Sequence, residues 1–422
     1  MFIPKHIKQN GSKLIDNLPS GWKYVKLGNT SITIIDGDRG KNYPKQTEFT
    51  NVGFCLFLNA GNVTNEGFNF TTQAFISEQR DNLLRNGKLQ RQDVVLTTRG
   101  TLGNVAYFDS KVQQEHIRIN SGMVILRADE KNVSSHYLYT LLQSPVFYNQ
   151  IETFITGSAQ PQLPIQILNQ FSIPLPPIRE QQRIAAVLSL WDEAILQTRK
   201  LIDACKRRKK GFMQKLLTGK WRFPEFRNNK DDWKYVKLGD VAETYSGGTP
   251  SRTNKAFFNG TIPWIKSGEL NQTNIYATEE HITEEALQQS AAKYVEANTL
   301  LYALYGATAG IPAITRIEAT INQAILAIIP SKSLDSVFLF YWLQSNKEKY
   351  LSEFLQGGQP NLSGEIVKEY FIPLPPFQEQ RKIASLLSLL DEEIHNWEQQ
   401  FEKLKLQKMG LMQKLLTGQI RV

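Results

Sequence analysis

The sequence predicts an α+β fold in which two globular domains are separated by two long helices that form an antiparallel coiled coil, with a circular, pseudo-two-fold organisation. Three observations support this prediction. Residues 174–195 and 373–394 are identical at fourteen of 22 positions after a shift of 199. Each copy begins a long helical pattern, and a long divergent passage precedes each. Such a repeat indicates a duplicated structural unit.

Length and composition are those of a globular protein with more than one domain. The 422 residues exceed a single typical core. Apolar residues make up 41% and charged residues 21%, which is ordinary for folded domains. The net charge of +9 suits a polyanionic partner such as nucleic acid, although a mildly basic protein with no such partner has the same charge.

The two cysteines indicate neither a disulfide framework nor a zinc site. Cys55 and Cys205 lie far apart with no C-x-x-C spacing, which is typical of a reducing compartment. The first residues, MFIPKHIKQN, lack an apolar signal core, and no run of 18 apolar residues occurs. We therefore expect a cytoplasmic protein without a membrane partner.

The repeat extends through the whole chain. Its shift falls from 211 residues at the first matching segment to 199 at the last, so the two copies differ in length within the divergent passages. The matching segments are WKYVKLG (22–28 and 233–239), Ile-Asn (119–120 and 321–322), LQS (142–144 and 343–345), Gln-Pro-x-Leu (160–163 and 359–362) and MQKLLTG (213–219 and 412–418).

The two ends of the chain also fit together. The second copy stops at TGQIRV, whereas the first continues as TGKWRFPEF. Ile3-Pro4 stands where Phe223-Pro224 stands in the first continuation. The chain thus resembles a two-unit circle cut at one point, and we expect its ends to lie close together.

Proline and glycine mark where the repeated helices begin and end. Pro176-Pro177 and Pro375-Pro376 favour extended backbone followed by a helix start, and Gly219 and Gly418 are suitable stops. We therefore divide the chain into a first domain (1–177), a central helix (178–219), a second domain (220–376) and a C-terminal helix (377–422).

Each helix carries an apolar seam with alternating spacings of three and four, which over about five heptads is typical of a coiled coil. Both seams contain a lysine at the same place, Lys209 and Lys408. The basic run 206–210 is either a solvated face or a surface for phosphates or a partner. The seams are Ile184, Leu188, Trp191, Ile195, Thr198, Ile202, Cys205, Phe212 and Leu216, and Ile383, Leu387, Leu390, Ile394, Trp397, Phe401, Leu404, Leu411 and Leu415.

The divergent passages contain hairpin patterns that could face DNA. In 93–108 and 298–314, an apolar strand leads into a glycine-bounded turn and a second strand. Arg99 could pair with guanine, and nearby hydroxyls could reach bases or phosphates. A hairpin tip without a partner is the alternative. The candidate residues are Thr98, Arg99 and Thr101 in the first hairpin and Tyr305 in the second.

One further loop in each passage combines glycines, hydroxyls and cations, which suit close approach to phosphate. These loops are 36–49 and 246–270, and they occupy similar places in the two copies. Their recurrence favours a binding role. The candidate residues are Arg39, Lys41 and Lys45 in the first loop, and Gly248, Thr249, Ser251, Arg252, Lys255, Trp264 and Lys266 in the second.

The residues needed for catalysis are not recognisable. There is no G-x-x-x-x-G-K-[ST] phosphate loop, and the five histidines lack metal-ligand spacing. In the LPPF segment at 374–377, leucine stands where an amino-methyltransferase motif needs Asp or Asn. We expect no catalytic residue, no metal and no cofactor on this chain. A DNA reader and a tandem protein scaffold both remain compatible with these observations.

The chain resembles the DNA specificity subunit of a type I restriction–modification system. The resemblance rests on the paired P-L-P-P-x-x-E-Q-x-x-I-A segments, the MQKLLTG helix ends, the WKYVKLG openings and, in the second copy, Gly-Gly-Thr-Pro-Ser at 247–251. The first copy lacks this last segment, so the resemblance implies less about the details of its loops. The specificity subunit of a related methylase–nuclease system is an alternative.

The resemblance implies a division of labour. Each target-recognition domain would read one half of a bipartite target in double-stranded DNA, and the helices would set the spacer between the halves. The helices would also dock two modification subunits, which bind S-adenosylmethionine and methylate adenine. Restriction subunits, which use ATP and Mg for translocation and cleavage, would join this complex.

Overall fold

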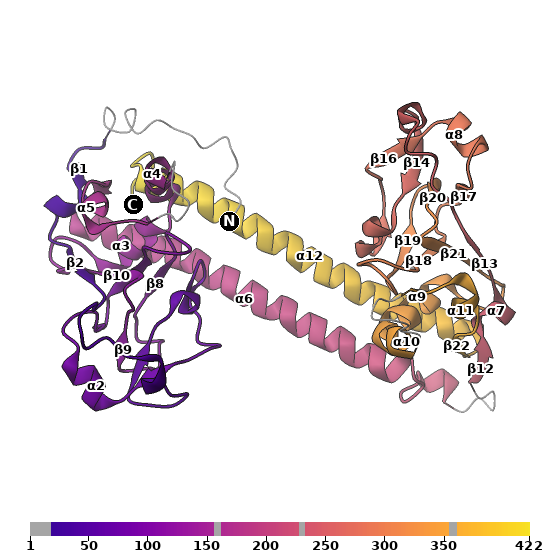
Figure 1. The fold of residues 1–422 in the computed structure, drawn as a ribbon, viewed down its shortest axis with the longest axis horizontal. Helices are drawn as coiled ribbons and strands as arrows, with labels where there is room; N and C mark the ends of the chain where they lie inside the picture. The colour runs from indigo at the N-terminus through magenta and orange to yellow at the C-terminus, as the bar shows by residue number, and fades with distance from the viewer. Residues whose placement is uncertain (1–17, 156–161, 228–232, 354–360) are drawn as a thin grey trace. The chain divides into compact units, whose positions relative to one another are not determined.

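The computed structural model describes residues 18–155, 162–227, 233–353 and 361–422 and divides into two compact units (Figure 1). The first unit comprises 1–199 and 400–422, and the second comprises 200–399. Each unit holds one globular α+β domain and part of both long helices, α6 (Ile178–Leu216) and α12 (Phe377–Leu416). The predicted fold class is therefore confirmed. Within the described residues, no helix is long and apolar enough to cross a membrane.

The first domain is built on a four-stranded antiparallel sheet of order β2-β10-β7-β8. A three-stranded sheet, β6-β3-β9, and a two-stranded sheet, β4-β5, complete it, together with short helices. The strands are β2 (Thr33–Asp36), β3 (Cys55–Phe57), β4 (Val63–Thr64), β5 (Gly67–Phe68), β6 (Phe75–Ile76), β7 (Val94–Thr97), β8 (Val105–Tyr107), β9 (Ile117–Arg118) and β10 (Met123–Arg127), and the helices are α2 (Glu78–Leu83), α3 (Ser135–Leu142), α4 (Pro145–Ile155) and α5 (Ile165–Leu168).

The second domain repeats this plan with a five-stranded sheet, β13-β21-β18-β19-β15, and a four-stranded sheet, β16-β14-β20-β17. Its strands are β13 (Ala242–Ser246), β14 (Ile262–Ile265), β15 (Asn274–Ile275), β16 (Glu280–Ile282), β17 (Lys293–Val295), β18 (Leu300–Ala303), β19 (Pro312–Thr315), β20 (Ala319–Ile321) and β21 (Ile325–Pro330), and its helices are α7 (Leu238–Val241), α8 (Glu284–Gln288), α9 (Ser336–Ser345), α10 (Lys347–Glu353) and α11 (Gly364–Lys368).

The repeated WKYVKLG and PLPP segments pair with each other. β1 (Lys23–Lys26) lies antiparallel to β11 (Ser172–Leu175), and β12 (Lys234–Lys237) lies antiparallel to β22 (Phe371–Leu374) in the same register. These two-stranded sheets lead directly into the long helices. The strand that opens each domain is therefore tied to the strand that closes it.

The apolar core of each domain includes the ends of both long helices. In the first unit, Ile184 and Leu188 of α6 and Leu415 of α12 are fully buried among the β-sheet and α3 residues. In the second unit, Ile383 and Leu387 of α12 occupy the corresponding place, with Leu216 of α6 beside them. Burial of such side chains stabilises a fold by roughly 1.5–3 kcal/mol each, so the helices are anchored by the domain cores.

The helices run antiparallel within each unit, and both seam lysines are ion-paired across them. In the first unit, Lys408 of α12 pairs with Asp192 of α6, with an Nζ–Oδ1 distance of 2.5 Å. In the second unit, Lys209 of α6 pairs with Asp391 of α12 at 2.6 Å. The two pairs are related by the same 199-residue shift. Every apolar seam residue predicted from the sequence is buried or partly buried.

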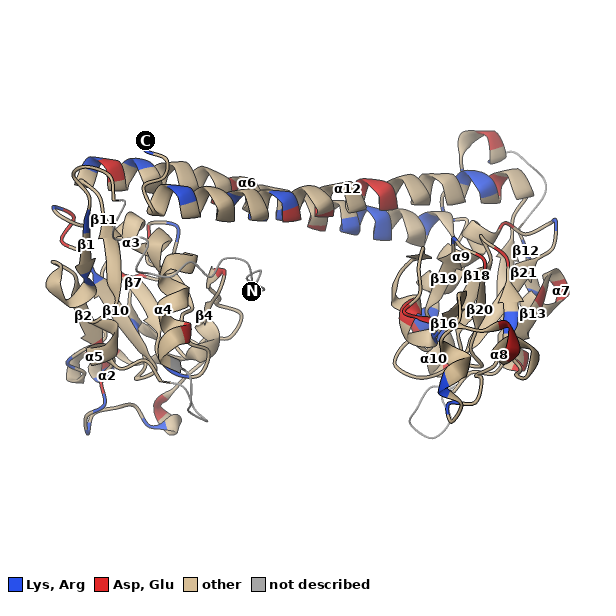
Figure 2. Ribbon diagram, turned by 90° about the horizontal axis from the view of Figure 1, so that it is seen from above, with Lys and Arg blue, Asp and Glu red and all other residues tan. Residues whose placement is uncertain are grey.

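Figure 2 shows basic and acidic residues along the two long helices, and three residues of the basic run 206–210 pair with carboxylates of α12. Lys206 pairs with Glu398 at 2.7 Å, Arg208 pairs with Glu393, and Lys209 is the seam lysine. These three cations are therefore balanced inside the second unit. The two exposed pairs, Lys206–Glu398 and Arg208–Glu393, contribute about 0–1 kcal/mol each to stability.

A buried carboxylate stands at the start of each long helix. The two oxygens of Glu180 accept hydrogen bonds from Arg421 Nε and Nη2 at 2.9 and 2.7 Å, and Oε2 also accepts one from Trp22 Nε1 at 3.1 Å. Glu379 accepts the same set from Arg222, at 2.9 and 2.6 Å, and from Trp233, at 3.2 Å. This explains why Trp and Glu recur in the repeated segments.

The following glutamines repeat a second set of hydrogen bonds. Gln181 Oε1 accepts from the Ser134 amide at 2.9 Å, and its Nε2 donates to the carbonyl oxygen of Pro176 at 2.8 Å. Gln380 makes the same two bonds to Asp335 and Pro375, both at 2.8 Å. Each helix start is thus tied to the loop before α3 or α9.

The end of the chain contacts the start of the described part of the first domain, whereas residues 1–17, on which the expected closeness of the two ends depends, lie outside the described residues. Beyond its contact with Glu180, Arg421 donates from Nη1 to the carbonyl oxygen of Ser20 at 3.3 Å. The segment after α12 therefore lies against the segment that opens the first domain. Ile3-Pro4, the predicted counterpart of Phe223-Pro224, lies outside the described residues.

The Glu180 interactions predict a pH dependence of stability. Arg421 lowers the pKa of Glu180, and the Trp22 hydrogen bond adds to this effect against the opposing effect of burial. Since the unfolded pKa is about 4.3, the interactions stabilise the fold above that pH, and this stabilisation is lost as the pH falls through the folded-state pKa.

We therefore expect Glu180→Gln to reduce the free energy of unfolding by about 2 kcal/mol at pH 7, and we expect the difference from wild type to shrink below about pH 4. Calorimetric melting of the full chain between pH 7 and pH 3.5 measures this. Glu398→Gln, which alters an exposed ion pair, is the control and should change stability by less than about 1 kcal/mol. An equal difference at both pH limits would contradict the assignment.

Candidate nucleic-acid interface

Three segments meet at the same place in each domain: a hairpin tip, the turn that enters the central strand, and the loop after the first strand of the larger sheet. In the first domain, the amides of Thr98 and Arg99 donate to the carbonyl oxygen of Gly122 at 2.8 and 3.2 Å. In the second, the Leu304 amide donates to the carbonyl oxygen of Ala324 at 2.8 Å.

The strand registers define which residues correspond. Val124 of β10 pairs with Asp36, the last residue of β2, and Leu326 of β21 pairs with Ser246, the last residue of β13. Counting from these pairs, the corresponding positions are Arg99 and Tyr305, Ser121 and Gln323, and Arg39 and Thr249.

Main-chain contacts hold each hairpin tip against Leu163 or Leu362, the last residue of the repeated Gln-Pro-x-Leu segment. The Leu163 amide donates to the carbonyl oxygen of Thr98 at 3.0 Å, and the Leu362 amide donates to that of Leu304 at 2.9 Å. Next to them, Gly100 and Gly306 have φ values of 72° and 85°, a conformation that side chains other than glycine rarely adopt. The tips are therefore shaped alike although their side chains differ.

The loop after the first strand can lie directly against the turn that enters the central strand because it begins with a glycine, which has no side chain. A Cβ atom on Gly37 would lie 2.2 Å from the carbonyl oxygen of Asn120, and one on Gly247 would lie 1.8 Å from that of Ile321. Beyond these glycines, Arg39 Nη2 donates to the carbonyl oxygen of Ser121 at 3.2 Å. The Thr249 hydroxyl donates to Oε1 of Gln323. Both contacts join the loop to the turn.

We call these side chains the first trio (Arg39, Ser121 and Arg99) and the second trio (Thr249, Gln323 and Tyr305). Arg39, Arg99, Thr249 and Gln323 are exposed, whereas Ser121 and Tyr305 are half-buried. The predicted site omitted Ser121 and Gln323. The signal that could have found them is the shared Ile-Asn pair at 119–120 and 321–322, because a different residue follows it in each copy.

The first domain presents its other predicted cations to solvent. Lys41 and Lys45 are exposed, and Arg39 is paired with Asp36 at 3.0 Å while remaining 48% exposed. Thr101 is exposed, and its carbonyl oxygen accepts a hydrogen bond from the Thr97 hydroxyl. This part of the surface has the positive charge that suits phosphate.

The predicted cations of the second domain are largely balanced by carboxylates. Arg252 pairs with Glu280 at 2.6 Å, and Lys266 pairs with Glu279 and Glu280 at 3.0 and 2.9 Å. The hydrogen bond from Arg252 lowers the pKa of Glu280, and the hydrogen bond to Glu280 raises the pKa of Lys266. Lys255 is exposed. The second surface is thus more nearly neutral than the first.

The remaining second-domain candidates lie close to this loop. Gly248 is buried, and its carbonyl oxygen accepts a hydrogen bond from Trp264 Nε1 at 3.2 Å. Ser251 is exposed and shares a 2.7 Å hydrogen bond with the hydroxyl of Thr253. These two residues therefore shape the loop from its inner and outer sides.

Two predicted site residues belong to the interior. Trp264, in β14, is 1% exposed, and the Arg252 guanidinium lies 5.0 Å from its ring centre. Thr98 is 4% exposed. In this structure neither side chain reaches the surface, because each belongs to a paired region of a sheet or hairpin. We therefore exclude both from the candidate interface.

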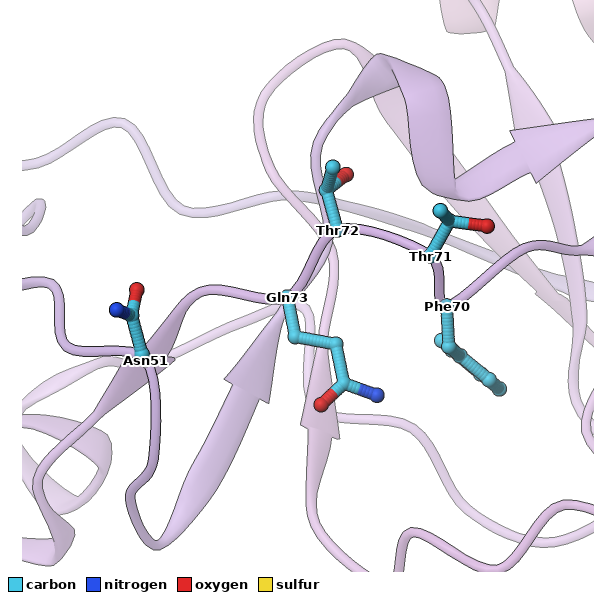
Figure 3. Close-up of a pocket in the computed structure, with 5 residues that line it drawn as sticks. All are labelled: Asn51, Phe70, Thr71, Thr72 and Gln73. Atoms are coloured by element: carbon cyan, nitrogen blue, oxygen red, sulfur yellow. The ribbon is translucent and has the colours of Figure 1, made fainter.

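The described residues contain no candidate metal centre. Within the described ranges, no cluster of three or more His, Cys, Asp or Glu side chains could hold a metal ion. Burial, with the Asp81 charge, raises the pKa of Cys55 to about 12, so its thiol stays protonated at neutral pH. An open hollow of about 470 Å³ is lined by uncharged side chains, which Figure 3 draws as sticks: Asn51, Phe70, Thr71, Thr72 and Gln73.

The two domains present similar surfaces that carry different side chains, an arrangement that suits recognition. The model of the type I restriction modification DNA specificity domain matches the chain twice, at residues 19–205 and 230–406. The chain therefore belongs to this family and is a non-catalytic specificity subunit of a type I restriction enzyme.

Curated relatives agree with this assignment. The chain is 26% identical to the type I restriction enzyme MjaVIII specificity subunit of Methanocaldococcus jannaschii, over 100% of this chain and 99% of that protein. It is also 26% identical to the EcoR124I/EcoR124II specificity subunit of Escherichia coli, over 67% and 69% of the two chains.

Two structures share the fold. One is a chain from a study of complex assembly and conformational transition of the type I restriction–modification system, with a TM-score of 0.62, 20% identity and coverage of 96% of this chain and 100% of that one. The other is a type I specificity subunit from M. genitalium, with a TM-score of 0.60, 16% identity and coverage of 95% and 97%.

Proposed function

We propose that each domain of this specificity subunit reads one half of a bipartite double-stranded DNA target, while α6 and α12 set the spacer and dock two modification subunits. The observation that carries this proposal is the correspondence of the two trios. Backbone of the same shape presents Arg39, Ser121 and Arg99 in one domain and Thr249, Gln323 and Tyr305 in the other. Backbone of equivalent shape that carries different side chains suits two domains that recognise different DNA sequences.

The first trio has the chemistry to read guanine. Arg99 stands on a tip whose neighbouring glycine, Gly100, has open space around it. A guanidinium presents donors in a planar fork, which matches the two major-groove acceptors of guanine. Lys41 and Lys45 lie on the loop that reaches the same place and would supply phosphate contacts.

The helices offer a repeated apolar contact for the modification subunits. Leu190 of α6 is 71% exposed, and Leu389, its counterpart in α12, is 58% exposed. Neither side chain lies in a seam, although the residues two positions before them, Leu188 and Leu387, are fully buried. Large exposed apolar side chains are typical of protein contacts, and their occurrence once per unit suits two copies of one partner.

The chemistry of the complex would reside on the partners. We expect S-adenosylmethionine on the modification subunits, and ATP and Mg on the restriction subunits. The specificity subunit of a related methylase–nuclease system is the alternative within the same class. A tandem scaffold that does not read DNA is the alternative from a different class, and it would have no use for the exposed polar side chains Arg99, Thr249 and Gln323.

The length of the helices is suited to a spacer role. α6 has 39 residues and α12 has 40. At 1.5 Å per residue each is about 60 Å long, which corresponds to roughly 17 base pairs at 3.4 Å each. This is enough for two short half-sites and a spacer.

Deleting one heptad from both helices should shorten the preferred spacer by about three base pairs and leave both half-sites unchanged. Residues 199–205 and 398–404 are suitable, because in each helix they lie between Asp192 and Lys209, or between Asp391 and Lys408. Methylome sequencing of cells that express the variant with its modification subunit reports the target. Deleting 199–205 alone is the control and should impair folding. An altered half-site with an unchanged spacer would refute the spacer role.

Arg99→Ala should relax the preference at one base pair of one half-site, with a cost of about 1–3 kcal/mol if the guanidinium pairs with guanine. Binding and methylation are measured on targets varied at each position. Lys41→Ala is the control, because loss of a phosphate contact should weaken all sequences alike and reduce the salt dependence. If Arg99→Ala behaves like Lys41→Ala, Arg99 contacts only phosphate.

Leu190→Glu and Leu389→Glu should each remove one modification subunit, because a buried unpaired charge opposes docking. Native mass spectrometry should then show one modification subunit per chain for each single variant and none for the double variant. Leu406→Glu is the control, since Leu406 is also 58% exposed but has no leucine counterpart in α6. Full occupancy in the double variant would place the docking surface elsewhere.

A further inference from the structure

Gln323 is held in a definite orientation at the centre of the second trio. It lies between β20 and β21, is exposed, and accepts a hydrogen bond at Oε1 from the Thr249 hydroxyl. Within the described residues, no other hydrogen bond of this side chain is present. Its Nε2 therefore keeps two donors, and Oε1 keeps a second lone pair. One edge of the amide remains able to donate and accept at the same time.

The surroundings of Gln323 favour a base over a phosphate. Glu279 and Glu280 balance the two nearby cations, Arg252 and Lys266. Phosphate contacts usually come from side chains with unbalanced positive charge or from helix N-termini. The uncharged amide of Gln323, in a region where the charges balance, would attract a phosphate only weakly. Readout of a base edge needs placed donors and acceptors rather than net charge.

The corresponding residues of the first domain show that this position differs in chemistry between the two units. There, Ser121 has too short a side chain to replace the amide, and the exposed groups of the first trio are the guanidinium groups of Arg39 and Arg99. A guanidinium offers only donors, which suits guanine, whereas an amide offers a donor and an acceptor, which suits N7 and N6 of adenine.

We propose that Gln323, oriented by Thr249, pairs with the major-groove edge of an adenine in the half-site read by the second domain. Nε2 donates to N7, and Oε1 accepts from the N6 amino group while keeping its bond from Thr249. Thr249 is a positioning residue, because its hydroxyl acts on the DNA only through the amide. This inference rests on the proposed function, since it requires the second domain to read DNA.

The test uses the full-length chain in complex with its modification subunits. Methylome sequencing defines the two half-sites, and replacing residues 231–372 by the equivalent segment of another specificity subunit identifies the half-site read by the second domain. Each adenine of that half-site is then changed to 7-deazaadenine, which lacks the N7 acceptor. At one position this change should weaken binding to the wild-type complex about fivefold or more.

Gln323→Met removes both hydrogen-bonding groups with little change in side-chain length. It should weaken binding to the native target about 10- to 100-fold, allow other bases at that one position, and abolish the effect of 7-deazaadenine there. Thr249→Val should weaken the same preference to a smaller extent. Gln272→Met, at an exposed glutamine of the same domain, should change neither the motif nor the affinity.

The outcomes separate the inference from the function on which it rests. If replacing 231–372 alters neither half-site, the proposed function fails. If it alters one half-site, but no adenine in that half-site is sensitive to 7-deaza substitution in the wild-type complex, the role of Gln323 is overturned. That role is also overturned if Gln323→Met keeps the wild-type motif and the wild-type response to 7-deazaadenine.

Discussion

The buried carboxylate at the start of each long helix is the interaction on which the rest of the structure depends. Glu180 and Glu379 each join the tryptophan just before the opening strand of a domain to an arginine that follows the end of the other long helix. A single side chain thereby ties a domain to both helices. Because a buried carboxylate requires such partners, the three segments must meet wherever the domain folds.

The sequence predicted the framework well, because the framework is carried by local and repeated patterns. Proline lead-ins, glycine stops and the heptad spacing are local signals, and the 199-residue shift shows which helix positions correspond. The sequence did not predict the partners of Lys209 and Lys408. Asp391 and Asp192 lie outside the apolar seams, so only the antiparallel register brings them opposite the lysines.

The candidate site was predicted less completely, because it forms where three distant segments meet. Arg99, Tyr305, Arg39 and Thr249 were expected from their hairpins and loops. Gln323 was not, because the Ile-Asn pair before it marks the position in the sequence but does not reveal its contact with Thr249. Trp264 was predicted to lie at the interface but is buried, for a related reason. Its neighbours in sequence suggested an exposed loop, whereas its place in β14, next to two other strands, buries it.

The trios rest on main-chain hydrogen bonds and on glycines, as at Gly122, Ala324 and Gly247. Peptide groups make these contacts, so they persist whatever side chain stands at Arg99, Tyr305 or Gln323. A substitution at one of these positions changes the side chain at the surface and hardly disturbs the backbone that carries it. Under the proposed function, a single substitution in one trio can therefore change one half-site at little cost in stability and leave the other half-site unchanged.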